Sequence, residues 1–108
     1  MTTPDELYEQ LTRLGTDWAD KNSAALLLKE NKKSILAQVT LQYLSKSKTI
    51  KQAETMAEAD GDYMKHIQNM VAAERASNIA RVNYDAMRTY VDLYRTQQAN
   101  ERIAMGMR

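Results

Sequence analysis

The chain has no cysteine and no phenylalanine, and only three glycines and one proline occur among its 108 residues. Without cysteine, the chain forms no disulfide and offers no thiolate ligand to a metal ion. A chain this poor in glycine and proline contains few turn signals, which favours long helices over a β-sheet. The core must be built mainly from aliphatic, methionine and tyrosine side chains, since there is a single tryptophan.

Long apolar runs are missing as well. The longest uninterrupted run covers residues 24–28, far short of the ~20 residues that a membrane-spanning helix needs. The N-terminal stretch contains Asp5 and Glu6 and has no hydrophobic signal core. We therefore expect a cytoplasmic protein without a membrane partner.

The net charge is only +1, but charges of one sign gather in blocks along the chain. Residues 1–20 sum to −4, residues 21–51 to +6, residues 52–74 to −4 and residues 75–108 to +3. This division matters more than the total, because a binding partner responds to the local electrostatic potential.

Two long helices dominate the predicted fold of a single helical domain, residues 1–108. Residues 62–104 contain neither glycine nor proline, which predicts one continuous helix of roughly 65 Å. Apolar residues at helical spacing predict a second long helix over residues 17–45, roughly 44 Å long. The simplest arrangement is all-α: an antiparallel, coiled-coil-like helical hairpin. Because the two helices differ in length, we also expect a homo-oligomer that covers the remainder of the longer one.

A short helix is predicted before the first long one, over residues 1–15. Thr3 and Glu6 have the spacing of a capping box, in which each side chain accepts a hydrogen bond from the other residue's backbone. Gly15 is expected to end this helix by adopting a positive φ.

A second short helix is predicted between the long ones, over residues 49–59. Thr49 and Gln52 offer another capping box at its start. Asp62 is expected to cap the long helix that follows.

The predicted oligomer interface lies on the helix over residues 62–104. Small side chains there allow a second backbone to approach closely, and larger apolar side chains fill the contact. The interface residues are Ala72, Ala76, Ile79, Met87, Tyr90, Val91 and Tyr94.

An arginine stripe recurs every seven residues on the same helix, which places it along one line of the surface. Its members are Arg81, Arg88, Arg95 and Arg102. Asp85 and Asp92 lie between them, so one interpretation is a solvated face that neutralises itself. The other is that the arginines bind phosphates or acidic residues of a partner. The role of the stripe stays open.

The lysine-rich segment is the predicted nucleic-acid site, because clustered lysines can contact several phosphates and give binding that weakens steeply with salt. The lysines are Lys21, Lys29, Lys32, Lys33, Lys46, Lys48 and Lys51. Ordinary surface lysines give the same pattern. Tyr43 lies nearby and either stacks on a base or belongs to the core.

No catalytic or metal motif is present. His66 is the only histidine, and Tyr63 occupies the position where a bundle-type metal site requires glutamate. The segment Asp60-Gly61-Asp62 lacks the further ligands of a calcium loop. No nucleophile motif or glycine-rich phosphate loop occurs, so we expect a protein that is not an enzyme and has no metal or cofactor.

A tryptophan lies near the start of a lysine-bearing helix, and a long tyrosine- and arginine-bearing helix follows. The residues that form this pattern are Trp18, Lys21, Lys29 to Lys33, Leu36-Ala37, Tyr63, Tyr84-Asp85-Ala86-Met87 and Tyr90-Val91-Asp92. In this order of parts the chain resembles small helical recombination accessory proteins of tailed phages, namely the UvsY-type recombination mediators. The similarity of pattern spans roughly residues 16–104, although this chain is shorter and lacks a longer loop between the helices.

The resemblance implies an accessory that binds single-stranded DNA, assembles into rings and helps to load a recombinase or single-strand annealing protein. It implies location in the cytoplasm of an infected bacterial host. Under this hypothesis the lysines of the first long helix contact phosphates, and the second long helix carries the assembly.

A rival hypothesis is a protein–protein adaptor or inhibitor. Its acidic segments, residues 1–20 and 52–74, would bind a basic host or phage partner. A third interpretation is a coiled-coil scaffold with no nucleic-acid contact. Salt-sensitive DNA binding that is lost on Lys→Ala changes separates the first hypothesis from both others.

Overall fold

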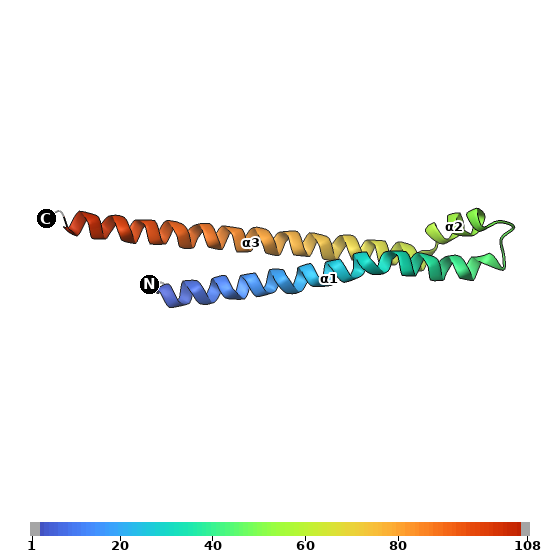
Figure 1. Ribbon diagram of the computed structural model, residues 1–108, viewed down its shortest axis with the longest axis horizontal. Coiled ribbons are helices and arrows are strands. Elements are labelled where there is room, and N and C mark those ends of the chain that lie inside the picture. The colour runs from blue at the N-terminus through green and yellow to red at the C-terminus, as the bar shows by residue number, and fades with distance from the viewer. Residues whose placement is uncertain (1–2, 107–108) are drawn as a thin grey trace. The chain divides into compact units, whose positions relative to one another are not determined.

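The computed structural model describes residues 3–106, and 92% of them are helical. Within this range the chain forms three helices and no strand: α1 (Pro4–Leu44), α2 (Ile50–Glu58) and α3 (Gly61–Gly106) (Figure 1). The all-α prediction is confirmed for these residues. None of the three helices, over the part of the chain described, combines the length and hydropathy needed to cross a membrane.

The chain divides into two compact units. Unit 1 combines the described parts of Met1–Asp20, from α1, and Asn78–Arg108, from α3. Unit 2 is Lys21–Ser77, which holds the rest of α1, all of α2 and the first part of α3. Each long helix therefore supplies one segment to each unit.

Side-chain caps start α1 and α2 at the predicted residues. The Thr3 amide donates to Glu6 Oε2 and the Glu6 amide donates to Thr3 Oγ1, both at 3.2 Å. At α2, the Gln52 amide donates to Thr49 Oγ1 at 3.1 Å. These bonds satisfy amides of the first helical turn that have no partner inside the helix. Both predicted helix starts are confirmed.

The start of α3 differs from the prediction by two residues. The Asp62 amide donates to Asp60 Oδ1 at 2.8 Å, and the Met64 amide donates to the Asp60 carbonyl at 2.9 Å. Asp60, rather than Asp62, is therefore the cap of a helix that begins at Gly61. A tertiary contact explains this choice of cap. The Tyr43 hydroxyl on α1 donates to Asp60 Oδ2 at 2.5 Å and holds the carboxylate in place.

Gly15 lies inside α1 and does not end it. No glycine among the described residues has a positive φ. A Cβ atom at Gly15 would lie 3.1 Å from Cε2 of Tyr84, so the missing side chain admits the tyrosine ring. The predicted break between residues 1–15 and 17–45 is wrong, because this packing outweighs the ~1 kcal/mol by which glycine disfavours a helix.

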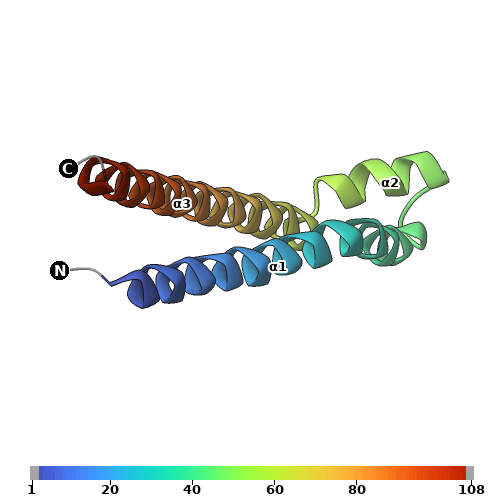
Figure 2. The same ribbon diagram turned by 60° about the vertical axis from the view of Figure 1, so that its left-hand side comes forward.

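Unit 1 is held by apolar and aromatic packing between α1 and α3, whose segments lie side by side in Figure 2. The ring centroids of Trp18 and Tyr84 are 5.6 Å apart. Arg95 lies over the ring of Tyr8, 5.7 Å from its centroid. Because an earlier residue of α1 contacts a later residue of α3, the segments run antiparallel. The almost fully buried residues of this unit are Leu7, Ala80 and Val91.

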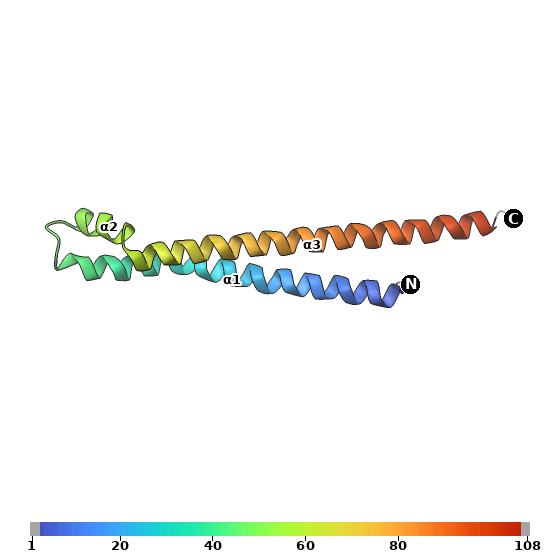
Figure 3. The same cartoon turned by 180° about the vertical axis from the view of Figure 1, so that it is seen from behind.

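Unit 2 has a core in which small side chains prevail. Its α2 lies beside the end of α1 and the first turns of α3 (Figure 3). Small side chains allow helices to approach closely, but each of them removes little apolar area from water. The buried residues are Ala25, Val39, Ala53, Ala57, Tyr63 and Ser77.

Polar contacts across the helices supplement this core. Nε2 of His66 on α3 lies 2.8 Å from the Leu28 carbonyl on α1, as a ring N–H that donates to it. Ser77 Oγ donates to Asn22 Oδ1 at 3.4 Å, also from α3 to α1. Their order along the two helices makes this pairing antiparallel too.

Candidate nucleic-acid interface

All seven lysines of the predicted site fall within unit 2. Four lie on α1, two in the connection to α2, and one on α2 itself. Six are exposed, and Lys32 is half-buried. Unit 2 carries nine basic and six acidic side chains, whereas the described residues of unit 1 carry five basic and eight acidic ones. All seven lysines thus belong to the more basic unit, in which roughly 35 Å of helix separates Lys21 from the end of α1.

Lys32 lies on the packed side of α1. It is seven residues from both Ala25 and Val39, which are buried, and this spacing returns to the same side of a helix. Its aliphatic stem therefore packs while its ammonium group reaches water. Lys29 and Lys33 are both exposed, and their spacing of four residues places them on one helix face. These two are better placed for phosphate contacts than Lys32.

A shallow groove of about 470 Å³ runs between α1 and α2 beside these lysines. Apolar residues of α1 form much of its lining, with Lys33 at one side and Glu54 and Glu58 of α2 at the other. The two carboxylates repel a phosphate that enters the groove. The groove itself is therefore unfavourable for a phosphate, whereas the lysine side of α1 outside it carries no such carboxylates of α2.

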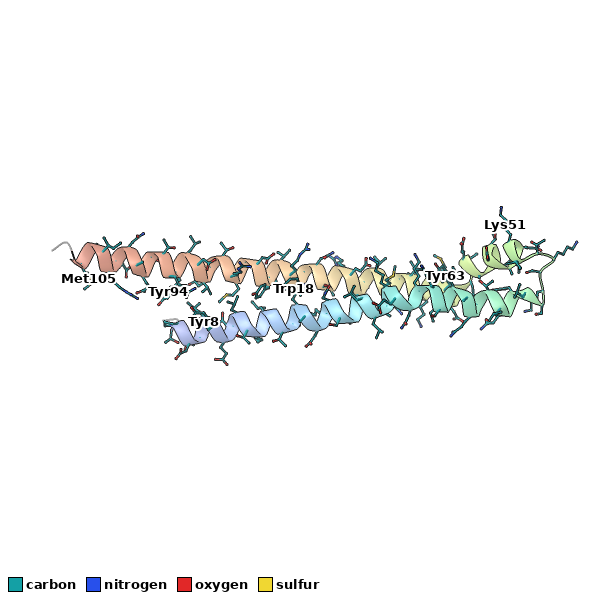
Figure 4. All side chains as sticks on the ribbon, viewed as in Figure 1. Tyr8, Trp18, Lys51, Tyr63, Tyr94 and Met105 are labelled. Atoms are coloured by element: carbon teal, nitrogen blue, oxygen red, sulfur yellow. The ribbon has the colours of Figure 1, made fainter. Side chains whose placement is uncertain are left out.

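The connection between α1 and α2 has an ordered backbone. Ser47 Oγ donates to the Tyr43 carbonyl at 2.8 Å, and the Lys48 amide donates to Gln52 Oε1 at 3.0 Å. The side chains of Lys46 and Lys48 are exposed. Lys51 follows on the first turn of α2, and Figure 4 shows its side chain directed outward. Three ammonium groups are thus presented on a preorganised turn.

Tyr43 links the end of α1 to the start of α3. It is half-buried, and its hydroxyl donates to the carboxylate of Asp60 at the start of α3. This hydrogen bond raises the pKa of Tyr43 above its ordinary 10.0, and burial and the negative charges of Asp60 and Asp62 act in the same direction. It also lowers the pKa of Asp60 below 3.8, with help from the Asp62 amide. The hydroxyl of Tyr43 is thus engaged within the chain, and its half-buried ring leaves less surface for stacking on a base.

The predicted oligomer interface is divided by the fold. Val91 is buried within unit 1, and Met87 and Tyr94 are half-buried there. Ile79 and Tyr90 are 47% and 52% exposed. In unit 2, Ala72 is exposed and Ala76 is half-buried. Within a single chain Ala72 and Ile79 are exposed, because their helical phase differs from that of the buried Ser77 and Ala80, so the interface between copies stays a prediction.

The arginine stripe is exposed along its whole length. Arg95 lies over the Tyr8 ring, a cation–π contact. Arg95 and Arg102 also line a groove of about 330 Å³ in unit 1, together with Tyr8 and Tyr94. The sequence alone does not indicate this groove, because nothing local to Tyr8 shows which part of the distant helix it contacts.

Nε2 of His66 is engaged in the hydrogen bond with the Leu28 carbonyl. Residues 3–106 contain no group of three or more His, Asp or Glu side chains arranged to hold a metal ion. The exposed side chains include lysines and arginines that can bind anions, carboxylates that can bind cations, and apolar groups that can pack on another surface.

Comparison with known proteins gives no match to any protein-family model, any curated protein or any solved structure. The resemblance to phage recombination mediators accordingly remains a hypothesis.

Proposed function

We propose that the protein is a non-enzymatic helical accessory that binds single-stranded DNA through unit 2. The observation that supports this function most directly is the presence of six exposed lysines in one compact unit. Each lysine that neutralises a phosphate releases a condensed counterion, which gives affinity without sequence preference. By its resemblance to recombination mediators, the protein would act as a homo-oligomeric helical hairpin that helps to load a recombinase or annealing protein.

The first test measures fluorescence anisotropy of a labelled single-stranded oligonucleotide at ~50 and ~200 mM salt. For single strands the log of the affinity falls with log salt by roughly 0.7 per phosphate neutralised. Replacing Lys46, Lys48 and Lys51 with glutamine is expected to weaken binding and to lower this slope by roughly 2. Lys29→Gln with Lys33→Gln is expected to lower it by roughly 1.4.

A matched control removes charge from the other unit. Arg81→Gln with Arg88→Gln deletes two exposed cations from α3 in unit 1. If unit 2 binds the DNA, this change leaves the slope nearly unaltered. Equal losses from both units would indicate non-specific attraction by total charge. Absence of binding at ~50 mM salt, where phosphate contacts are strong, would overturn the proposal.

The second candidate is an adaptor for a basic protein partner. Exposed carboxylates on the first part of α1 favour it, and they belong to the more acidic unit. These residues are Asp5, Glu6, Glu9 and Asp20. The acidic segment over residues 52–74 supports it less, because Asp60 is engaged by Tyr43 and by the start of α3. Binding of a basic protein that the lysine variants leave unchanged would favour this candidate over DNA binding.

A further inference from the structure

An apolar stripe on α3 in unit 1 is left largely exposed by the residues that the structure describes. Its large members are Ile79, Val82, Tyr90 and Leu93, which are 47%, 60%, 52% and 64% exposed. Ala86, also exposed, lies at its centre. We call these five residues the outer stripe. Exposed apolar side chains that adjoin one another in this way mark interaction surfaces more often than isolated ones do.

Helical spacing places the outer stripe on one line. Its members follow one another at intervals of three, four, four and three residues, and Val82 and Leu93 are eleven apart. Eleven residues make slightly more than three full turns at 3.6 residues per turn, so this spacing stays on one side of a straight helix. The residues of α3 that face α1, such as Ala80 and Tyr84, are turned from it by roughly 130° at 3.6 residues per turn. The outer stripe is therefore a second apolar face and not the edge of the intrachain contact.

The outer stripe is symmetric about its centre. Ile79 and Leu93 lie seven residues before and after Ala86, and Val82 and Tyr90 lie four residues before and after it. A face with this pattern is complementary to a reversed copy of itself, which is the requirement for an isologous two-fold interface. We infer that two copies of this chain pair through the outer stripe, with the two α3 helices antiparallel and the two-fold axis at Ala86.

The pairing matches side-chain sizes. In the antiparallel register, Ile79 packs on Leu93 of the second copy, and the bulky Tyr90 packs on the smaller Val82. At the axis Ala86 meets Ala86 of the second copy, which allows the two backbones to approach. A parallel pairing would set tyrosine against tyrosine beside an alanine–alanine gap, and it would align the helix dipoles unfavourably. The antiparallel register is therefore the better packed.

Most of the border of the stripe is uncharged. Asn78, Asn83 and Thr89 flank it at helical spacing, and the charged residue nearest to its centre is Asp85, turned from Ala86 by roughly 100° around the helix. The outer stripe is about 22 Å long, which makes the interface smaller than the standard size for stable complexes. We expect a dissociation constant on the order of 10–100 μM from this contact alone.

Because the chain has no cysteine, disulfide cross-linking tests the register directly. Ala86→Cys is expected to form a cross-linked dimer under mild oxidation. Val82→Cys alone and Tyr90→Cys alone are expected to cross-link poorly, whereas an equal mixture of the two cross-links readily. Arg81→Cys, on another side of α3, serves as the background control. Unchanged far-ultraviolet circular dichroism establishes that each variant is folded.

Sedimentation velocity supplies the second measurement, over concentrations from about 1 to 500 μM. The wild-type chain is expected to shift from monomer to dimer, and Ala86→Glu is expected to remain monomeric because two carboxylates would meet at the axis. Monomer throughout, with Ala86→Cys no better than the control, would overturn the inference. Cross-linking by Val82→Cys alone as strong as that of the mixture would overturn the antiparallel register.

This inference deepens the proposed self-association and does not depend on DNA binding. Both measurements are made without DNA, so their failure leaves the anisotropy result unaffected. Conversely, a dimer that binds no DNA would overturn the proposed function and leave the pairing of α3 intact.

Discussion

The two units join the same two long helices with different side chains. In unit 1 the rings of Trp18 and Tyr84 pack together, and Gly15 gives them room. In unit 2 most of the buried residues are small, and hydrogen bonds cross between the helices, such as that of His66 with the Leu28 carbonyl. Apolar rings supply more buried area, whereas small side chains leave more of the specificity to polar groups.

The two units should therefore respond to different perturbations. The packing of rings depends on shape and on the removal of apolar surface from water. Its contribution to stability does not require a group to gain or lose a proton. The contact between Tyr43 and Asp60 in unit 2 joins two ionisable groups, so its contribution depends on pH. Truncation of a ring should therefore affect unit 1 most, and extremes of pH should affect unit 2 most.

The largest effect is expected from Tyr84→Ala in unit 1. The change removes the ring that packs on Trp18 and covers Gly15. Because Tyr84 is half-buried, we expect unfolding to become easier by about 2–3 kcal/mol, below the full range for buried aromatic residues. Urea unfolding followed by the fluorescence of Trp18, the only tryptophan, measures it.

Tyr90→Ala is the matched control, since it removes the same side chain from the same helix at a 52% exposed position. Measured at a concentration where the chain is monomeric, it should cost less than about 1 kcal/mol. Equal losses for both variants would contradict the assignment of Tyr84 to the core of unit 1.

A smaller effect, confined to unit 2, is expected from Tyr43→Phe. The folded pKa of Asp60 is lowered, so the stability it contributes is present above pH 3.8 and is lost as the pH falls through the folded pKa. The folded pKa of Tyr43 is raised, so its contribution is present below pH 10.0 and is lost as the pH rises through the folded pKa. Without the Tyr43 hydroxyl, the part of the pH dependence of stability that comes from the hydrogen bond between Tyr43 and Asp60 is lost at both low and high pH.

Carbon-13 NMR of the Asp60 carboxyl group measures this directly. In Tyr43→Phe the pKa of Asp60 should rise toward 3.8, because the largest cause of its depression is lost. Tyr8→Phe in unit 1 is the control and should leave the Asp60 titration unchanged. If the pKa of Asp60 is the same in Tyr43→Phe as in the wild type, the hydrogen bond does not form in solution.

The smallest effect is expected from a pair of glycine substitutions. Alanine is favoured over glycine in a helix by about 1 kcal/mol. Gly61, in unit 2, has nothing within 4 Å of its added Cβ, so Gly61→Ala should stabilise the chain by up to about that amount. In Gly15→Ala, the Tyr84 ring must shift by a few tenths of an ångström, and we expect a net change below about 0.5 kcal/mol.

Urea unfolding followed by far-ultraviolet circular dichroism compares the two variants. The difference between them isolates the contact of Gly15 with Tyr84. Equal stabilisation by both changes would show that the ring moves freely and that unit 1 is less tightly packed than its geometry indicates.

Local sequence patterns account for where helices form and for where two of them begin. Scarce glycine and proline leave the backbone few alternatives to helix. Thr3 and Thr49 cap helices through residues three positions away, so their role is visible in the local sequence. The presence of all seven lysines in one unit also follows from the sequence, because they lie within residues 21–51.

Three features follow only from contacts between distant segments: the continuation of α1, the start of α3 and the face of α3 that is buried. Gly15 continues a helix because a tyrosine ring from α3 occupies the space of its missing side chain. Asp60, and not Asp62, starts α3 because the hydroxyl of Tyr43 holds it. The local sequence also does not show which apolar face of α3 packs on α1, because α3 has two such faces. In the structure the face with Val91 is buried and the face with Leu93 is exposed. Local propensities act within a few residues, whereas that choice depends on contacts between segments far apart in the sequence.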